Sequence, residues 1–344
     1  MKTVGVLESF ATNSAATFFD FDLVTPVATG KDLLVRIDGI SINPVDLKER
    51  RDIVGKLDEP LVLGWDACGE VISVGDDVQA FKVGDKVMYA GEITRPGCYA
   101  EFQLVDERIV GPKPYKLTSE EAACLPLTSL AAWEALFDRL EIGRIAEENT
   151  ALLIIGGAGG LGSMAIQFAR QLSKCKVIST ASREKSKDWC LKMGAHHVID
   201  HSKNIKSQLV ELGHDTVPLI LNLSDNIPYW EVMADIVSPE GAICLVASTK
   251  AKLDLDLFMG KSVRINYELM FTRSMYSTNK MSVQSDILRN VAEMIDSGRI
   301  IHTKTESMGN ISAENITKAH ARVETGRMIG KVTLSGGFVA QNSC

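Results

Sequence analysis

A glycine-rich turn in the middle of the chain has the spacing of a phosphate-binding loop. Gly157, Gly159 and Gly162 stand in GGAGGLG, directly after the apolar run ALLII and directly before an amphipathic segment. Small residues at this spacing let the backbone approach a pyrophosphate, and the start of the following helix offers unpaired N–H donors and partial positive charge. Because a strand, a helix and a second strand flank the turn, the pattern favours a dinucleotide site over a ligand-free turn.

The end of the second strand bears on which dinucleotide binds. NAD enzymes usually place Asp or Glu there to bind the ribose hydroxyls. This chain has STASREKSK instead, in which Ser182 and Arg183 can bind a 2′-phosphate and Lys185 and Lys187 add positive charge. We therefore expect NADPH as the cofactor. The alternative is a solvated helix start that binds nothing specific, and Glu184 supports that alternative.

The elements that position this turn follow from the apolar periodicity. Short apolar alternations broken by Gly, Pro and Asp predict a β-rich domain up to about residue 120, and a helix with Ser119 as its N-cap is expected over 119–140. Strands and helices then alternate, which predicts a doubly wound parallel sheet with 263–271 as its edge strand. The last helices and the strand at 330–335 are expected to return to the β-rich domain. The predicted domains are 1–123 with 275–344, and 124–274.

Composition narrows the class of protein. With 45% hydrophobic and 24% charged residues the chain is globular, and a net charge of −7 argues against a nucleic-acid surface. No apolar run reaches the roughly 18 residues needed to cross a bilayer, and the start of the chain does not read as a signal peptide. We expect a cytoplasmic protein that binds neither membrane nor nucleic acid.

The metal-ligating residue types are scattered. The seven cysteines form no CxxC pair, and all six histidines come after residue 195. Structural zinc sites need closer, repeated spacing. We expect buried, unpaired thiols and no metal.

Six motifs in order resemble one family over nearly the whole chain. They are INPVDLK at 42–48, LGWDACGEVISVG at 63–75, LPLTSLAAWEAL at 125–136, GGAGGLGSMAIQFAR at 156–170, GAHHVIDHS at 194–202 and ELMFTRS at 268–274. The chain resembles the medium-chain dehydrogenase/reductase superfamily, and within it the zinc-free quinone oxidoreductase (zeta-crystallin-like) branch, whose members are often labelled zinc-binding alcohol dehydrogenases. The resemblance implies a GroES-like β-rich catalytic domain and a Rossmann cofactor domain.

The positions that match zinc ligands differ from those of the zinc-dependent relatives. Those relatives have Cys where this chain has Asn43, and His-Glu where it has Trp65 and Asp66. Trp cannot ligate zinc and Asn is a poor ligand for it. The resemblance therefore also implies that no metal is bound.

The resemblance further implies a set of cofactor contacts. His201 is expected near the adenosine end, or else as a surface histidine, and Thr128 is expected near the nicotinamide, or else bonded to its own backbone. The pyrophosphate would meet the glycine turn, and the 2′-phosphate would meet the start of the next helix. The implied cofactor-binding residues are Ala158, Gly159, Gly160, Leu161, Ser182, Arg183, His201, Val246, Ala247, Ser248, Leu269, Met270 and Phe271.

Without zinc, the charge that develops on the acceptor oxygen must be met by hydrogen-bond donors. Asn43, Lys48, Thr128 and Arg273 are the donors expected near the pocket, with the first three as the catalytic candidates. Relatives often have Tyr where this chain has Lys48, and that side chain can equally point to solvent. Asp46 is expected to be a structural hydrogen-bond acceptor rather than a general base.

The resemblance implies NADPH-dependent hydride transfer to a quinone or an α,β-unsaturated carbonyl, and a conjugated acceptor suits a site without zinc because it spreads the developing charge. Two alternatives stay open: a zinc-type alcohol or aldehyde dehydrogenase, and a non-catalytic NADPH-binding protein on the same fold. The resemblance also implies a homodimer, because the family commonly dimerises through an edge strand of the cofactor domain. SVRINYELMF would supply that strand here, since an exposed strand edge tends to be paired.

Overall fold

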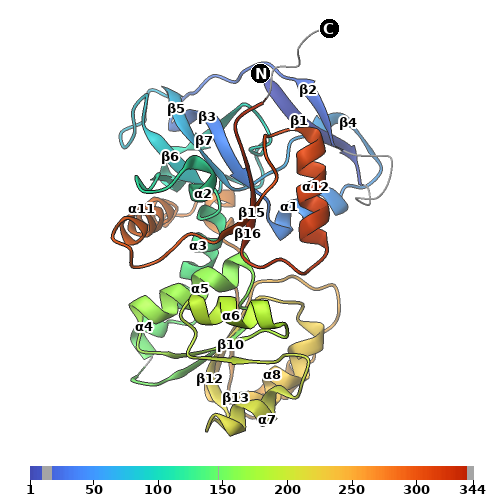
Figure 1. The fold of residues 1–344 in the computed structure, drawn as a ribbon, viewed down its shortest axis with the longest axis vertical. Coiled ribbons are helices and arrows are strands. Elements are labelled where there is room, and N and C mark those ends of the chain that lie inside the picture. Colours follow the sequence, from blue (N-terminus) through green and yellow to red (C-terminus); the bar gives the residue numbers. More distant parts are fainter. Residues whose placement is uncertain (10–17, 146, 339–344) are drawn as a thin grey trace. The chain divides into compact units, whose positions relative to one another are not determined.

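The computed structural model describes residues 1–9, 18–145 and 147–338 (Figure 1). The chain divides into two compact units, one formed by Met1–Leu130 with Phe271–Cys344 and the other by Ala131–Met270. The boundaries expected from the sequence, at 123/124 and 274/275, lie a few residues from these. Among the described residues, no helix combines the length and the apolar character needed to cross a bilayer.

The unit Ala131–Met270 is built on a six-stranded parallel sheet. Its strand order is β11-β10-β9-β12-β13-β14, so the chain runs outward in one direction from β9 and then in the other direction from β12. This is the doubly wound Rossmann order, and β14 lies at the edge, as predicted. The strands are β9 (Ala151–Ile155), β10 (Lys176–Thr180), β11 (His197–Ile199), β12 (Val217–Asn222), β13 (Val237–Leu245) and β14 (Arg264–Tyr267).

Helices precede and connect the strands of this sheet. The elements are a π-helix (Glu134–Arg139), α4 (Ile142–Ile145), α5 (Gly160–Leu172), α6 (Glu184–Lys192), α7 (Ile205–Glu211), a 3₁₀ turn (Ile227–Tyr229), α8 (Trp230–Ile236) and α9 (Asp256–Met259). All five residues of β9 are buried. That agrees with the prediction that the ALLII run is a strand covered on both faces.

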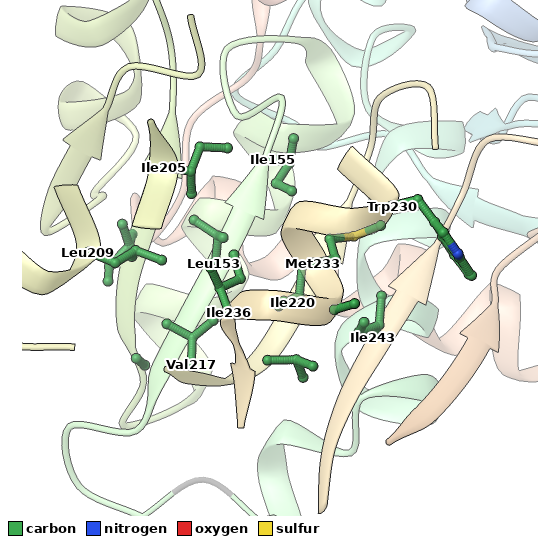
Figure 2. Packing of buried hydrophobic residues seen from close by; sticks show 14 of the residues in the cluster. Leu153, Ile155, Ile205, Leu209, Val217, Ile220, Trp230, Met233, Ile236 and Ile243 are labelled. Atoms are coloured by element: carbon green, nitrogen blue, oxygen red, sulfur yellow. The ribbon is translucent and has the colours of Figure 1, made fainter. Parts of the chain in front are cut away.

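One face of the sheet packs against α7 and α8, as Figure 2 shows. Leu153 and Ile155 of β9 point into this cluster with Ile220 of β12. Met233 and Trp230 of α8 close it, and Trp230 is only 5% exposed. Because side chains alternate along a strand, Leu152 and Ile154 face the opposite side, where α5 contacts β9.

The other unit holds a seven-stranded and a three-stranded sheet. The larger sheet has the order β15-β16-β3-β5-β6-β8, with β7 also paired to β3, and the smaller has the order β2-β1-β4. β16 pairs antiparallel with β3, so the C-terminal strand does return to the β-rich unit. The strands are β1 (Lys2–Glu8), β2 (Phe19–Asp22), β3 (Asp32–Ser41), β4 (Lys56–Leu61), β5 (Ala67–Val74), β6 (Lys86–Tyr89), β7 (Phe102–Asp106), β8 (Val110–Pro112), β15 (Lys304–Ser307) and β16 (Lys331–Ser335).

Helices of this unit cover its sheets. α12 contacts both β16 and α1, and α11 contacts β8. The elements are α1 (Pro44–Arg51), a 3₁₀ turn (Glu107–Ile109), α2 (Ser119–Ala122), α3 (Pro126–Trp133, which runs on into the other unit), α10 (Thr272–Met275), α11 (Val283–Asp296) and α12 (Ala313–Glu324).

Two predicted elements are wrong in extent. The single helix expected over 119–140 is interrupted between α2 and α3, because Pro126 lacks an N–H and disfavours helix at the residue before it. Its last part, Glu134–Arg139, is a π-helix rather than an α-helix. The N-cap is Thr118 rather than Ser119, since the Glu121 N–H donates to Thr118 Oγ1 at 3.2 Å and the Thr118 N–H donates back to the Glu121 carboxylate at 3.0 Å. The strand expected over 263–271 ends at Tyr267.

Candidate functional site

The glycine turn packs too tightly for side chains at two positions. A Cβ on Gly157 would lie 1.7 Å from Ser179 Oγ, and one on Gly162 would lie 2.5 Å from Gly157 Cα. The turn therefore lies directly against β10, and α5 begins at Gly160 with Gly159 as its N-cap. The first N–H groups of α5 are consequently placed at the carboxyl edge of the sheet, where an anion can be held.

Hydrogen bonds from neighbouring elements hold this turn. The Gly156 N–H donates to Thr180 Oγ1 at 3.0 Å at the end of β10. The Trp189 indole N–H donates to Ser163 Oγ at 2.8 Å, and that hydroxyl donates to Gly159 O at 2.7 Å. α5, α6 and β10 thus fix the geometry of the turn, so that little ordering remains when a ligand binds.

The expected cofactor residues of this unit share one edge of the sheet. Each group directly follows a strand, and the carboxyl ends of parallel strands lie together; ligands of such sheets bind there, at the point where the strand order reverses. Ala158, Gly159, Gly160 and Leu161 follow β9, Ser182 and Arg183 follow β10, His201 follows β11, Val246, Ala247 and Ser248 follow β13, and Leu269 and Met270 follow β14. Their individual contacts with a cofactor stay predictions.

Arg183 stands at the start of α6, next to the end of β11. The Arg183 N–H donates to Ser186 Oγ at 3.3 Å, and that hydroxyl donates to Arg183 O at 2.7 Å, which caps the helix. Lys187 Nζ lies 4.0 Å from the carboxylate of Asp200, a residue that sequence reasoning did not single out. Asp200 offsets part of the charge of Lys187, and binding of a 2′-phosphate by Arg183 stays a prediction. His201 is exposed.

In the other unit, a buried lysine joins two residues that match zinc-ligand positions. The Lys331 ammonium donates to Ile42 O at 2.8 Å and to Asn43 Oδ1, and it lies 3.2 Å from Asp66 Oδ2. The Asn43 amide N–H groups point to Asp66 Oδ2 at 2.9 Å and to Trp65 O at 3.4 Å. Lys331, Asn43 and Asp66 are all buried. We call these three residues the lysine network.

The lysine network is closed. The three N–H donors of Lys331 meet three oxygen acceptors, and both N–H groups of the Asn43 amide are engaged. The Leu127 N–H at the start of α3 donates to Asp66 Oδ1 at 2.8 Å. Burial raises the pKa of Asp66, whereas the ammonium and these N–H donors lower it. Lys331 was missed because its only sequence signal is one charge at the start of the apolar strand KVTLS.

A second buried chain of hydrogen bonds begins at Asp46 of α1. Asp46 Oδ2 accepts the Asn43 N–H at 2.8 Å and the Tyr99 hydroxyl at 3.0 Å, and that hydroxyl lies 2.9 Å from His320 Nε2. Burial raises the pKa of Asp46 to about 7, and burial together with Arg50 holds the pKa of His320 well below its usual range. Asp46 is thus a hydrogen-bond acceptor inside the unit, as expected.

Arg50 determines which group donates and which accepts in each of these hydrogen bonds. The Arg50 guanidinium lies 3.3 Å from His320 Nδ1, and a guanidinium can only donate. Nδ1 therefore accepts, and a neutral His320 carries its hydrogen on Nε2 and donates to Tyr99. The Tyr99 hydroxyl is then left to donate to Asp46, so every group has one consistent role.

Lys48 and Thr128 have partners of their own. Lys48 is exposed on α1, and its ammonium lies 2.9 Å from the Asp52 carboxylate, which raises the pKa of the lysine. The Thr128 hydroxyl is directed to the backbone oxygens of Cys124 and Leu125, at 3.3 and 3.1 Å. Both arrangements match the non-catalytic alternatives left open by the sequence. The catalytic roles stay predictions.

Phe271 and Arg273 follow β14 but belong to the β-rich unit. Both are buried, and the Phe271 ring meets the Trp65 ring edge-on with 6.3 Å between centroids. Trp65 itself donates from its indole N–H to Glu92 O at 3.2 Å. Phe271 is therefore placed with the residues around the lysine network rather than with the parallel sheet.

Comparison with known proteins identifies the family to which this chain belongs. The family described as alcohol dehydrogenase GroES-like domain matches residues 29–115, and the one described as zinc-binding dehydrogenase matches residues 160–286. A zinc-type alcohol dehydrogenase-like protein of Staphylococcus epidermidis is 37% identical over 337 residues, which is 97% of this chain and 99% of that protein. The chain belongs to the medium-chain dehydrogenase/reductase superfamily. Both parts of the expected fold, GroES-like and Rossmann, are thereby confirmed.

Solved structures of this superfamily have the same fold. A putative zinc-dependent alcohol dehydrogenase of Rhizobium etli is 44% identical with a TM-score of 0.94, and the match covers 98% of this chain and 99% of that one. A quinone oxidoreductase of Coxiella burnetii is 25% identical with a TM-score of 0.78, over 98% and 99% of the two chains. This member of the superfamily is an oxidoreductase.

The names of these relatives raise the question of zinc, and the side chains present do not fit that metal. At the matching positions Asn43 and Asp66 are bonded to an ammonium, and the Trp65 indole has no lone pair to offer a metal. Within the described ranges, no group of three or more His, Cys, Asp or Glu residues is placed to hold a metal ion. The six described cysteines are unpaired and buried, and Cys344 lies outside the described residues.

Proposed function

We propose that this protein is an NADPH-dependent oxidoreductase that transfers hydride to a quinone or an α,β-unsaturated carbonyl without zinc. The observation that carries the proposal is the lysine network. At two of the positions that match zinc ligands, Asn43 and Asp66 already bind the Lys331 ammonium. The two N–H groups of the Asn43 amide are also engaged, one with Asp66 and the other with Trp65 O. An acceptor that delocalises its own developing charge needs the least help from such a site.

The residues of the parallel-sheet unit supply the cofactor site in this proposal. The N–H groups at the start of α5 hold the pyrophosphate, and Arg183 with Ser182 holds the 2′-phosphate. NADPH supplies a hydride when it is bound. Val246, Ala247 and Ser248 at the end of β13 border the nicotinamide half, because that half lies across the switch point from Arg183. Proton delivery to the product comes from water, since the hydroxyl of Thr128 is directed to its own backbone.

The test of the proposal compares cofactors and acceptors. Titration of the purified protein with NADPH should quench tryptophan fluorescence at lower concentration than titration with NADH. NADPH oxidation should then be seen with quinones and enones and should be far slower with the matching saturated ketones and aldehydes. Equal affinity for the two dinucleotides would remove the cofactor claim. Equal rates with saturated and conjugated carbonyls would remove the claim about the acceptor.

A second candidate is a non-catalytic NADPH-binding protein. It is favoured by the partners of two expected catalytic residues, Lys48 at the surface with Asp52 and Thr128 with its own backbone. The two candidates differ in turnover. If a panel of quinones and enones gives no NADPH oxidation at high protein concentration while NADPH still binds, the non-catalytic candidate is the correct one.

We also infer a cytoplasmic homodimer that pairs through β14. The described cysteines are unpaired, which suits a reducing compartment, and β14 is an edge strand whose Tyr267 is 59% exposed. Light scattering should give twice the chain mass of 37.5 kDa. Tyr267→Glu should shift the mass toward the monomer, while the same change at the exposed Tyr115 of the other unit should not. A monomeric wild type would contradict the inference.

A further inference from the structure

A π-helix ends at an arginine that reaches the residue just beyond β14. The backbone of Leu140 donates to Ala135 O at 2.9 Å, five residues back, which is the widened turn of a π-helix. Such turns are rare and recur at functional sites. The wider turn carries Arg139 to Glu268, with 2.8 Å between Arg139 Nε and Glu268 Oε2. Glu134 Oε2, at the start of the π-helix, lies 4.0 Å from the same guanidinium.

The two carboxylates around Arg139 are buried, whereas Arg139 itself is partly exposed. The side chains of Glu134 and Glu268 are both 0% exposed, whereas that of Arg139 is 30% exposed. A carboxylate in such surroundings is costly to leave without its cation, so Arg139 and Glu268 hold each other in place. The Glu268 N–H also donates to the backbone oxygen of Leu245, the last residue of β13, at 2.9 Å. Glu268 is therefore fixed through its backbone to the sheet and through its side chain to the π-helix.

Glu268 lies just after β14 and directly before Leu269 and Met270, the two residues expected to contact the nicotinamide half of the cofactor. Arg183 lies beyond β10, on one side of the switch point between β9 and β12, and β13 and β14 lie on the other. A dinucleotide whose phosphorylated ribose meets Arg183 must extend its nicotinamide half over the ends of β12 and β13, toward β14. Leu269 and Met270, which directly follow Glu268, are in the right place to border that half.

We propose that Arg139 and Glu268 are positioning residues that hold the Leu269–Met270 backbone in the conformation that receives the nicotinamide half of the cofactor. This inference rests on the proposed function and adds a specific role to two residues outside the glycine turn. Neither residue touches the cofactor in the proposal. Their effect is to keep a short segment preordered, so that binding does not have to order it.

The chain offers a matched control for the buried pair. Arg264, the first residue of β14, lies with its Nη1 3.0 Å from Glu141 Oε2, just after the π-helix. This second pair joins the same two segments, but its side chains are 43% and 32% exposed. Exposed ion pairs contribute little to structure. Arg264→Gln therefore removes an ion pair between the same segments without disturbing Glu268.

The experiment measures two dissociation constants for each variant, one for NADPH and one for adenosine 2′,5′-bisphosphate, which lacks the nicotinamide half. Glu268→Gln keeps the shape of the side chain and removes its charge. We expect it to weaken NADPH binding by about tenfold while the constant for the bisphosphate stays within about twofold. Arg264→Gln should change neither constant. A role limited to the stability of the unit would move both constants together.

Arg139→Lys is the second variant, in case Glu268→Gln does not fold. It keeps the positive charge but loses the planar fork of the guanidinium, so NADPH binding should weaken selectively, by about threefold. If folded Glu268→Gln or Arg139→Lys binds NADPH as the wild type does, or loses both ligands equally, the inference is overturned while the proposed function stands. If the wild type itself binds no NADPH, the proposed function fails and the inference fails with it.

Discussion

The Lys331 ammonium lies 3.2 Å from the Asp66 carboxylate, and the two side chains are 4% and 0% exposed. The pair connects the first residue of β16 to the residue just before β5, so it joins the C-terminal strand to the N-terminal part of the same unit. With Asn43 it forms the lysine network, a polar cluster without an open donor. Because Asn43 and Asp66 are engaged in this cluster, they are not available as metal ligands in this chain.

Removing the cation of this pair should destabilise the protein strongly. Lys331→Met leaves the buried Asp66 carboxylate without its cation, which costs about 3–5 kcal/mol in the free energy of unfolding. Urea unfolding monitored by fluorescence measures the change. Lys331→Met/Asp66→Asn should recover part of the loss, because the neutral amide needs no cation. Lys86→Met, at an exposed lysine paired with Glu70, is the control and should stay close to wild type; equal stability of the two single variants would contradict the prediction.

Zinc should neither bind nor matter. The ammonium of Lys331 repels a divalent cation from Asn43 and Asp66, so protein dialysed against zinc and then desalted should carry far less than one zinc per chain by elemental analysis. Incubation with a strong zinc chelator should leave NADPH oxidation unchanged. About one zinc per chain, or loss of activity that zinc restores, would instead support a zinc-type dehydrogenase.

Arg183 should set the preference between the two dinucleotides. Arg183→Gln removes the guanidinium expected to bind the 2′-phosphate, so the dissociation constant of NADPH should rise by about tenfold while that of NADH stays the same. Fluorescence titration measures both constants. Lys192→Gln, in the last turn of the same helix and beside Trp189, should change neither. An equal change for NADPH and NADH would show that Arg183 does not meet the 2′-phosphate.

Stability should depend on pH through Asp46. Its pKa is about 7 in the folded unit and near 3.8 in an unfolded chain, so ionisation favours the unfolded state. Its contribution is therefore lost as pH rises from about 4 to about 7 and is constant above that range. Asp46→Asn removes the titration and keeps an oxygen for Tyr99. Relative to wild type, this variant should gain on the order of a few kcal/mol between the two ends of that range.

Urea unfolding at several pH values checks this prediction. His320 acts in the opposite sense, because its folded pKa is depressed and its protonation at low pH opposes folding. That effect is common to wild type and Asp46→Asn, so it cancels when the two are compared at each pH. Parallel pH profiles for the two proteins would show that Asp46 does not titrate in this range.

Local patterns in the sequence were enough to predict the fold of the unit Ala131–Met270. The apolar run before Gly157, the spacing of the glycines and the alternation of strands and helices predicted the parallel sheet, its edge strand and the turn that leads from β9 into α5. These features rest on neighbours in sequence, so spacing alone predicts them. Phosphate binding by that turn stays a prediction. The single helix predicted over 119–140 was wrong, because Pro126 interrupts a helix that the apolar pattern would have continued.

The pairing of polar groups that lie far apart in the sequence became visible only in the folded chain. Three buried pairs join residues that are far apart in the sequence, and the neighbouring residues do not indicate which partner each one contacts. The pairs are Lys331 with Asp66, Tyr99 with His320, and Arg139 with Glu268. A buried charge must find its partner wherever the folded chain brings one, because the cost of leaving it unpaired is large. For this reason the sequence could suggest Asn43 as a free donor, while the fold places both of its N–H groups on Asp66 and Trp65.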